Sequence, residues 1–337
     1  MTEYRIAEPL RILQTACAHS NLDISFIGEE SGHLARVSDG TSFFYSGGAE
    51  TPTYPLNNAV GQDLCNDKSY CSDLLSNAGL EVPKGKIFFP GFSKDNAYKI
   101  YNHGIPDALN YVHEEHEYPV IVKPNRGSMG RGVQLVSNDT DFVLAMQQTV
   151  EYGHACLVQE CIRGDEYRLF CLDGLPRFIY RKQKPSVTGD GISTLRELFR
   201  QSQNVRFELL ELRQSTDFLW KQKSCFISES LSESIWDGVP QEGAIINLSG
   251  LGNLAAGCQI DQFKTRFEPA HYEMAKVVSE VLQVQICGID FFSKGEGFSD
   301  NIIIEVNGNP SLRGTWESGR EKLCIDIWQD IFRLYFK

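Results

Sequence analysis

The sequence predicts a mixed α/β (α+β) fold in two or three domains, and three observations support this prediction. Short β-branched runs alternate with segments of helical periodicity along the chain. Two β-rich runs flank a glycine-rich turn at residues 125–132. Two further runs near the C-terminus carry acidic residues between apolar ones and are joined by a short loop. A chain of 337 residues, 42% of them hydrophobic, can also bury a substantial core.

The first 65 residues predict a small α/β unit. Apolar residues recur at helical spacing before Asn21, which ends the predicted helix: Ile6, Leu10, Leu13 and Cys17. Strand-like runs follow at residues 22–28 and 41–45. This unit shows no pattern of catalytic residues, and we expect it to form one wall of a substrate site.

A capped helix is predicted after this unit. Asp67 is typical of a helix N-cap, and Gly79 is typical of the residue that follows a helix C-terminus. Lys68 then lies in the first helical turn, where the positive end of the helix dipole attracts phosphate. The alternative interpretation of Lys68 is an isolated surface lysine.

The glycine-rich turn has the features of a phosphate-binding hairpin. Residues 120–122 form a β-branched run that Pro124 closes, so Lys123 lies at the end of a predicted strand. Gly127, Gly130 and Gly132 precede a second β-rich run at residues 133–136. Glycines leave backbone N–H groups bare, so the chain can approach a polyphosphate closely, and the lysine adds a point charge.

Other nucleotide-binding patterns fit this stretch less well. A dinucleotide fingerprint and a P-loop both lead from the glycine turn into a helix, whereas this turn leads into a strand. A protein kinase also has a glycine-rich hairpin, but the chain has no H-R-D or D-F-G segment. An ordinary glycine hairpin remains the alternative.

The middle of the chain predicts helices at residues 105–116 and 142–150 and a buried strand at 155–159. His113 and His116 are spaced i and i+3, unlike the i and i+4 histidines of H-E-x-x-H zinc sites. The strand leads into residues 160–166, where a strand end can offer backbone groups to an adenine edge and a carboxylate to a ribose hydroxyl. Asp173-Gly174 then predicts a type I′ turn between two strands.

The next segment predicts a second glycine-bearing loop and several connecting elements. In residues 187–198, Ser193 is expected to cap a helix that runs through Phe199. The charged stretch 206–223 predicts an exposed helix, and residues 242–250 predict a strand. Pro269 suits the first turn of a helix that runs through Leu282.

The acidic residues near the C-terminus predict a metal site. Residues 286–292 and 301–307 form two strands joined by a loop, and pairing about that loop places Asp290 close to Glu305. Side chains alternate along a strand, so Asn307 projects from the same face as Glu305. Two carboxylates and an amide suit Mg²⁺, which bridges protein carboxylates and nucleotide phosphates. Ordinary alternation in a half-exposed sheet is the alternative.

Composition excludes several classes of protein. The net charge of −12 argues against nucleic acid as a partner. No stretch approaches 18 uncharged apolar residues and no basic leader precedes an apolar run, so we expect no membrane partner and a cytoplasmic location. The ten cysteines never form C-x-x-C and are expected to be reduced core thiols. A local basic cluster indicates either a small anionic ligand or a solvated face: Arg177, Arg181, Lys182 and Lys184.

These motifs occur in the order found in the ATP-grasp superfamily, which the chain resembles from about residue 66 to 313. The group it is most similar to comprises the ligase modules of cyanophycin synthetases, bifunctional glutathione synthetases and ribosomal-protein glutamate ligases. The similar segments are Lys123-Pro124 with Gly130-Arg131-Gly132-Val133, Val187-Thr188-Gly189-Asp190-Gly191 with Thr194-Leu195-Arg196-Glu197-Leu198, and Asn247-Leu248-Ser249. The combination is far more specific than any single segment.

The resemblance implies an ATP-grasp fold in which nucleotide is held between two α+β subdomains. The implied boundaries are an N-terminal domain at 1–65, a central or lid subdomain at 66–158 and a C-terminal subdomain with the magnesium site at 159–337.

The resemblance also implies roles for particular residues. Lys68 and Lys123 would contact phosphates. The mobile cover would be Gly127, Ser128, Gly130, Arg131 and Gly132. The adenine hinge and ribose contact would be Gln159, Glu160, Ile162 and Glu166. Two Mg²⁺ ions, which Mn²⁺ could replace, would be bound by Asp290, Glu305 and Asn307. The substrate carboxyl or acyl phosphate would be held by Arg313 with Lys182 or Arg181.

The chain departs from the family pattern at two places and differs from D-alanine ligases at a third. Gln159 precedes Glu160 at the hinge, where a glutamate usually comes first. Gly250-Leu251-Gly252 replaces a usual pair of glycines. D-alanine ligases carry an arginine two residues before the first metal aspartate, and Gly288 occupies that position here, so D-alanine is not the expected substrate.

The resemblance implies an ATP-dependent carboxylate–amine ligase acting on amino acids or short peptides through an acyl phosphate, with release of ADP and phosphate. It is compatible with a homodimer. The competing hypothesis is an ATP-binding regulatory or scaffold protein without ligase activity. The presence of both lysines and all three proposed metal ligands favours the enzyme.

Overall fold

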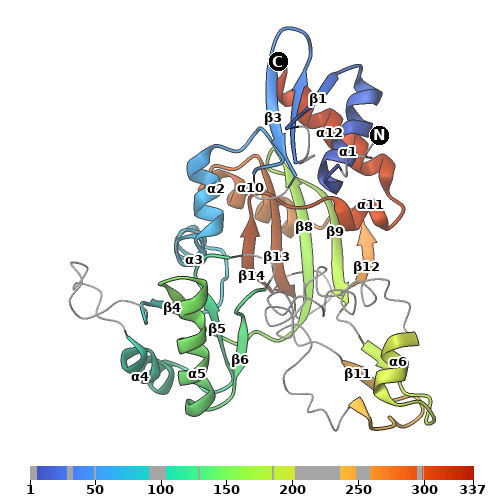
Figure 1. The fold of residues 1–337 in the computed structure, drawn as a ribbon. Helices are drawn as coiled ribbons and strands as arrows, with labels where there is room; N and C mark the ends of the chain where they lie inside the picture. The colour runs from blue at the N-terminus through green and yellow to red at the C-terminus, as the bar shows by residue number, and fades with distance from the viewer. Residues whose placement is uncertain are drawn as a thin grey trace.

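The computed structural model describes residues 6–28, 33–48, 51–90, 104–127, 130–183, 186–201, 236–247, 259–293, 298 and 300–337. These residues form a mixed α+β fold with antiparallel sheets, as the sequence predicts (Figure 1). The predicted exposed helix at 206–223 and the Gly250-Leu251-Gly252 segment lie outside the described residues.

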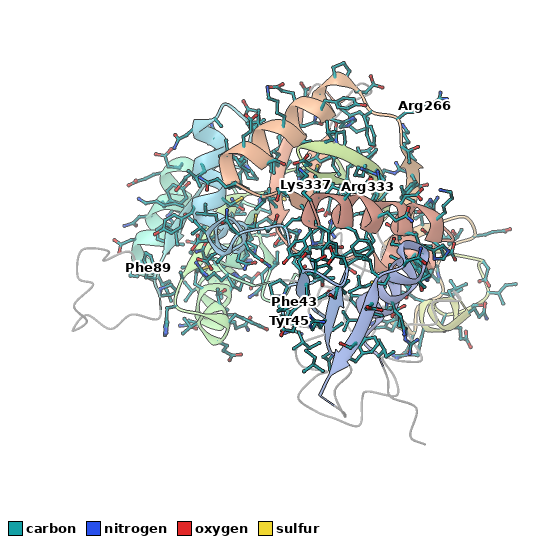
Figure 2. All side chains as sticks on the ribbon, turned by 90° about the horizontal axis from the view of Figure 1, so that it is seen from above. Phe43, Tyr45, Phe89, Arg266, Arg333 and Lys337 are labelled. Carbon is teal, nitrogen blue, oxygen red and sulfur yellow. The ribbon has the colours of Figure 1, made fainter. Side chains whose placement is uncertain are left out.

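The N-terminal unit consists of a helix and a three-stranded sheet in the order β1-β2-β3. Its elements are α1 (Glu8–Ser20), β1 (Asp23–Ile27), β2 (Leu34–Ser38) and β3 (Phe43–Gly47). Asn21 ends α1 in the left-handed conformation, as predicted. Along β3, Phe44 is buried, while its neighbours Phe43 and Tyr45, both labelled in Figure 2, are exposed.

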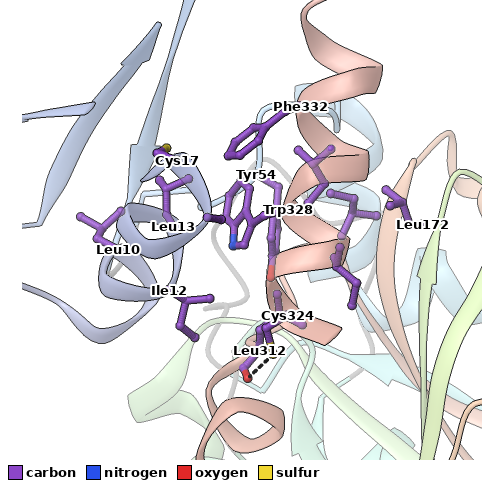
Figure 3. Close-up of a cluster of buried hydrophobic side chains, with 14 of the residues drawn as sticks. Leu10, Ile12, Leu13, Cys17, Tyr54, Leu172, Leu312, Cys324, Trp328 and Phe332 are labelled. Atoms are coloured by element: carbon purple, nitrogen blue, oxygen red, sulfur yellow. Dashed lines mark hydrogen bonds between the residues drawn. The ribbon is translucent and has the colours of Figure 1, made fainter. Parts of the chain in front are cut away.

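The N-terminal unit shares its core with the C-terminal helix α12 (Glu321–Tyr335), which the sequence analysis did not predict. Apolar side chains of α1 pack towards Trp328 and Phe332 of α12, with Tyr54 beside Trp328 (Figure 3). A short helix, α11 (Arg313–Glu317), precedes α12. The two ends of the described chain therefore pack together, and the proposed boundary at residue 65 stays a prediction.

A four-stranded sheet in the order β4-β7-β5-β6 carries the glycine-rich hairpin. Its strands are β4 (Gly85–Phe88), β5 (Val120–Pro124), β6 (Gln134–Val136) and β7 (Cys156–Glu160). One face packs against α4 (Ile105–Glu115) and α5 (Asp139–Thr149), which the 3₁₀ turn η2 (Val150–Tyr152) follows. The glycine-rich turn joins β5 to β6 as an antiparallel hairpin, as predicted.

A five-stranded sheet in the order β12-β9-β8-β13-β14 forms the centre of the C-terminal half. Its strands are β8 (Asp165–Leu172), β9 (Leu175–Gln183), β12 (Gln259–Lys264), β13 (Ile286–Ser293) and β14 (Asn301–Asn307). Asp173 and Gly174 both have positive φ at the β8–β9 turn, as a type I′ turn requires. One face packs against α2 (Ala59–Asn66), α3 (Lys68–Asn77) and α10 (Pro269–Leu282).

The remaining elements form a small unit of β10 (Ser186–Thr188), β11 (Ile245–Asn247) and α6 (Leu195–Gln201). The predicted cap of α6 was wrong by one residue. Thr194 caps the helix, because its Oγ1 accepts from Glu197 N (3.2 Å) while its own N–H donates to Glu197 Oε2 (2.8 Å). Ser193 instead donates to Asp190 (2.7 Å). Among the described helices, none is both long and apolar enough to cross a membrane.

Candidate functional site

One face of the five-stranded sheet carries a cluster of charged side chains. The register pairs Arg168 of β8 with Asp290 of β13, and Asp290 with Glu305 of β14, as the sequence predicts for the last pair. Directly opposed residues project from the same face. Lys182 of β9 and Glu166 of β8 complete the cluster, because the Lys182 Nζ lies 2.7 Å from Glu166 and 3.0 Å from Asp290. The structure therefore brings together charges from four strands.

Asp290 is the most heavily paired carboxylate of this cluster. Arg168 donates from its Nε to Asp290 Oδ1 (2.7 Å) and from an Nη to Oδ2 (2.5 Å). Asp290 is 2% exposed. Burial alone would raise the pKa of Asp290, but Arg168 and Lys182 hold this pKa below its ordinary value. Asp290 is consequently ionised and bound by two cations.

Lys68 connects the glycine-rich hairpin to the acidic strand. It opens α3, whose N-cap Asp67 accepts from Tyr70 N (3.1 Å) as predicted. The Lys68 Nζ donates to Gly127 O of the hairpin (2.7 Å) and lies 3.3 Å from Glu305 Oε1. Residues that are far apart in sequence thus meet at a single ammonium group.

Lys123, near the end of β5, is 8% exposed and has Lys68 as a charged neighbour. Burial, together with the neighbouring charge of Lys68, lowers the pKa of Lys123 to about 8. The attraction of Glu305 does not offset these two effects, so the buried ammonium would gain from a further anionic partner. The role of Lys123 as a phosphate contact stays a prediction.

The hairpin has the backbone conformation that its glycines permit. Gly127, Gly130 and Gly132 all have positive φ, and a Cβ on Gly132 would lie 2.8 Å from the Pro124 ring. Arg131 is exposed, and Ser128 lies outside the described residues. This part of the chain can present backbone N–H groups to a ligand.

The predicted adenine hinge lies on and after β7. Gln159 is buried, and it lines a small cavity together with Lys68 and Glu305. Glu160 is bound to the backbone of Lys84, which donates to its Oε1 (2.8 Å) and accepts from its N–H (2.9 Å). Ile162 is half-buried after the strand end. A larger open groove between α10 and the β8–β9 turn contains none of the predicted site residues.

The structure separates the two candidate substrate-binding groups on β9. Lys182 lies in the charged cluster, whereas Arg181 lies on the opposite face, in ion pairs with Asp165 and Asp261. Arg313 is half-exposed at the start of α11 and pairs with Glu8 (3.1 Å) and Glu317 (2.7 Å). Neither arginine is brought into the cluster.

Two residues of this region were missed by the sequence analysis. Arg168 could have been noticed because it lies two residues after Glu166 on the same strand, so both side chains share one face. Asn125 is buried beside the hairpin, where its Oδ1 accepts from Ser69 N (2.9 Å) and its carbonyl accepts from Lys68 N (3.1 Å). No signal in the sequence distinguishes Asn125 from an ordinary turn residue.

The donor set fits a hard divalent cation. Asp290, Glu305 and Asn307 lie on the same face of the β13–β14 hairpin, with Asn307 Nδ2 at 3.5 Å from Asp290 Oδ2. Oxygen ligands of this type suit Mg²⁺ or Mn²⁺. Within the described ranges, no group of three or more His, Cys, Asp and Glu side chains is arranged to hold a metal.

The sequence and fold comparisons agree with the motifs. Residues 65–178 match the model of the ATP-grasp domain. The crystal structure of a bifunctional glutathione synthetase from Pasteurella multocida superposes with a TM-score of 0.52 at 15% identity, over 91% of this chain and 40% of that one. The described residues thus have the ATP-grasp fold, and the resemblance to the ATP-grasp superfamily is confirmed.

The sequence is similar to particular members of that superfamily. It is 23% identical over 260 residues to the glutathione biosynthesis bifunctional protein GshAB of Listeria innocua, covering 76% of this chain and 32% of that protein. It is 25% identical over 256 residues to the protein of the same name from Streptococcus mutans, covering 73% and 32%. The chain spans about a third of the length of these relatives.

Proposed function

We propose that the chain is an ATP-dependent ligase that joins a carboxylate to an amine. The observation that carries this proposal is the position of Lys68, whose ammonium contacts both the glycine-rich hairpin and Glu305 of the acidic strand. A nucleotide whose phosphates reach Lys68 and Lys123 would then lie beside Asp290 and Glu305. The ATP-grasp match and the glutathione-biosynthesis relatives support the same reaction class.

The proposed reaction proceeds in two steps. A substrate carboxylate oxygen attacks the γ-phosphorus of ATP, so an acyl phosphate forms and ADP leaves. An amine then attacks the acyl carbon, phosphate leaves and the amine loses a proton, which gives an amide. Phosphorylation is needed because a carboxylate is a poor electrophile.

The residues of the cluster have separate proposed roles. Lys68 and Lys123 hold and neutralise the phosphates, and the hairpin backbone covers them. Asp290, Glu305 and Asn307 would hold one or two Mg²⁺ ions, which neutralise charge on the phosphates during transfer. Positioning and electrostatics dominate such a transfer, so no protein nucleophile is required.

Two further groups are proposed for recognition. The Glu166 carboxylate accepts a hydrogen bond from a ribose hydroxyl in place of its present bond from Lys182. Burial raises the pKa of this carboxyl above its ordinary value. Lys182, rather than Arg181, is the candidate for the acyl phosphate, because Lys182 lies in the cluster. Amino acids or short peptides are the proposed substrates.

The experiment is an assay of ADP and phosphate release across a panel of amino acids and short peptides, with mass spectrometry of the product. We expect release that depends on one carboxylate and one amine substrate, and a product lighter by one water than their sum. Nucleotide binding without release under any pair would favour the regulatory or scaffold alternative. Full activity of Glu305→Gln would contradict the metal assignment.

A further inference from the structure

Each carboxylate predicted to bind the metal is already neutralised by the protein's own cations. Asp290 is bound by Arg168 and Lys182, and Glu305 by Lys68. We propose that Arg168 is a positioning residue that keeps the metal position closed until a polyphosphate arrives, so that the divalent cation enters only with the nucleotide. This inference rests on the proposed function and concerns the order in which its parts assemble.

The charges of the cluster do not favour a free metal ion. The carboxylates are Glu166, Asp290 and Glu305, and the cations in contact with them are Lys68, Arg168 and Lys182. Three negative charges therefore face three positive ones, and Lys123 adds a fourth positive charge when protonated. A site with this balance attracts an anion and repels a dication.

The geometry of Arg168 makes its ion pair difficult to replace. Its guanidinium binds both oxygens of Asp290 in a planar, two-bond arrangement. Both side chains are largely withdrawn from water, with side-chain exposures of 18% and 3%. A metal ion arriving alone would have to lose water and leave the guanidinium unpaired, which is costly in a buried site.

A polyphosphate changes this balance. Its oxygens offer Lys68, Lys182 and Arg168 new anionic partners, so the cations can exchange a carboxylate for a phosphate without being left unpaired. Asp290 and Glu305 are then free to accept a metal ion between themselves and the phosphate. Arg168 thus couples the two binding events, since its release from Asp290 requires a second anion.

The test uses two partial ligands on the full chain. Binding of Mn²⁺ alone is followed by electron paramagnetic resonance, and binding of ADP in excess EDTA by calorimetry. We expect ADP to bind without metal, and Mn²⁺ alone to bind at least tenfold more tightly to Arg168→Met than to the unmodified chain. The matched control is Arg177→Met, which removes an arginine of the same strand pair that contacts Asp330 instead. This control should leave Mn²⁺ binding unchanged.

The outcomes separate this inference from the proposed function. If Mn²⁺ alone binds the unmodified chain as tightly as it binds Arg168→Met, the inference is wrong while the ligase proposal stands. If ADP fails to bind with or without Mn²⁺, the proposed function itself fails. Should Arg168→Met not fold, as judged by circular dichroism, Arg168→Lys keeps the charge but loses the two-bond contact, and it should bind Mn²⁺ more tightly than the unmodified chain does.

Discussion

Two halves of one sheet face have opposite characters. Towards α12, strands β8, β9 and β13 present Phe170, Phe178 and Ile286 to a closed apolar core. A few residues further along the same strands, that face presents Arg168, Lys182 and Asp290. The comparison teaches that the half covered by α12 is closed by apolar packing, whereas the other half holds buried charges in ion pairs and carries the proposed ligand site. Changes in the first should therefore affect stability, and changes in the second should affect ligand binding.

The largest expected effect is on the covered half. Trp328 is 1% exposed and packs against Tyr54 and Phe332. Trp328→Ala should lower the free energy of unfolding by about 3–5 kcal/mol, because it removes a large buried ring and leaves a cavity. Urea denaturation measures the loss, and Tyr45→Ala on the exposed side of β3 serves as the control. A loss below about 1 kcal/mol would show that this core does not hold the two ends of the chain together.

The next effect is at the neighbouring four-stranded sheet, whose strand β5 carries Lys123 near the charged half. Lys123→Met should lower the rate of ADP release from ATP about 100-fold or more, because one buried cation proposed to bind phosphate is lost. The free energy of unfolding should not fall, since burial and the charge of Lys68 disfavour the Lys123 ammonium more than Glu305 favours it. The control is Lys322→Met, whose side chain is 88% exposed on α12. Equal rates of ADP release in the two variants would show that Lys123 does not contribute to the proposed nucleotide site.

We predict a change of stability with pH from a buried histidine of α10, the helix that packs on the other face of the sheet. His271 is 1% exposed among aromatic rings, and burial lowers its pKa to about 4. Between pH 6.5 and 4 the unfolded chain binds a proton that the folded chain does not, so stability falls as pH falls through this window. We expect a loss of about 1–3 kcal/mol.

Unfolding by urea at pH 7 and pH 4.5 measures this dependence. His271→Leu should flatten it, although that variant also loses the bond from Glu268 N to His271 Nδ1 (3.0 Å). His113→Gln, at an exposed site paired with Asp139, should leave the contribution of His271 in place. If the free energy of unfolding of His271→Leu changes with pH as steeply as that of the unmodified chain, other groups cause the dependence.

The smallest expected effect is the pH dependence of nucleotide affinity. Because the pKa of Lys123 is about 8, its charged fraction falls between pH 7 and pH 9, and affinity should fall up to about tenfold with it. Calorimetry with ADP at the two pH values gives the ratio. Lys123→Arg should bind with little pH dependence over this range, since arginine stays charged. A steep fall of ADP affinity between pH 7 and pH 9 in Lys123→Arg would show that another group causes the pH dependence.

Local signals in the sequence predicted much of the fold. Asp67 and Gly79 bound a helix because capping chemistry acts over one turn. Asp173-Gly174 fixed a hairpin because both residues accept positive φ. The pairing of Asp290 with Glu305 followed from strand alternation across a short loop. Each of these features depends on residues that are close in sequence.

Features that depend on distant contacts were not predictable in this way. Arg168 and Asp290 lie 122 positions apart, and no local pattern pairs them. Alternation separates Arg181 from Lys182 but does not say which of the two faces the cluster. The packing of α12 on α1 is likewise set by the tertiary core. The catalytic and ligand-binding roles of the site residues and the domain boundaries stay predictions.

The anchoring of the glycine-rich hairpin has a mechanical consequence. Arg126 binds Asp63 of α2 through two bonds (2.6 and 2.9 Å), and Asn125 and Gly127 are bound to the start of α3. Three successive residues at the base of the loop are therefore hydrogen-bonded to α2 and α3. Any molecule that draws the Lys68 ammonium away removes one of these fastenings. Binding of such a molecule would then make local opening at the base of the loop easier. Faster exchange of the backbone amide hydrogens there would record this change.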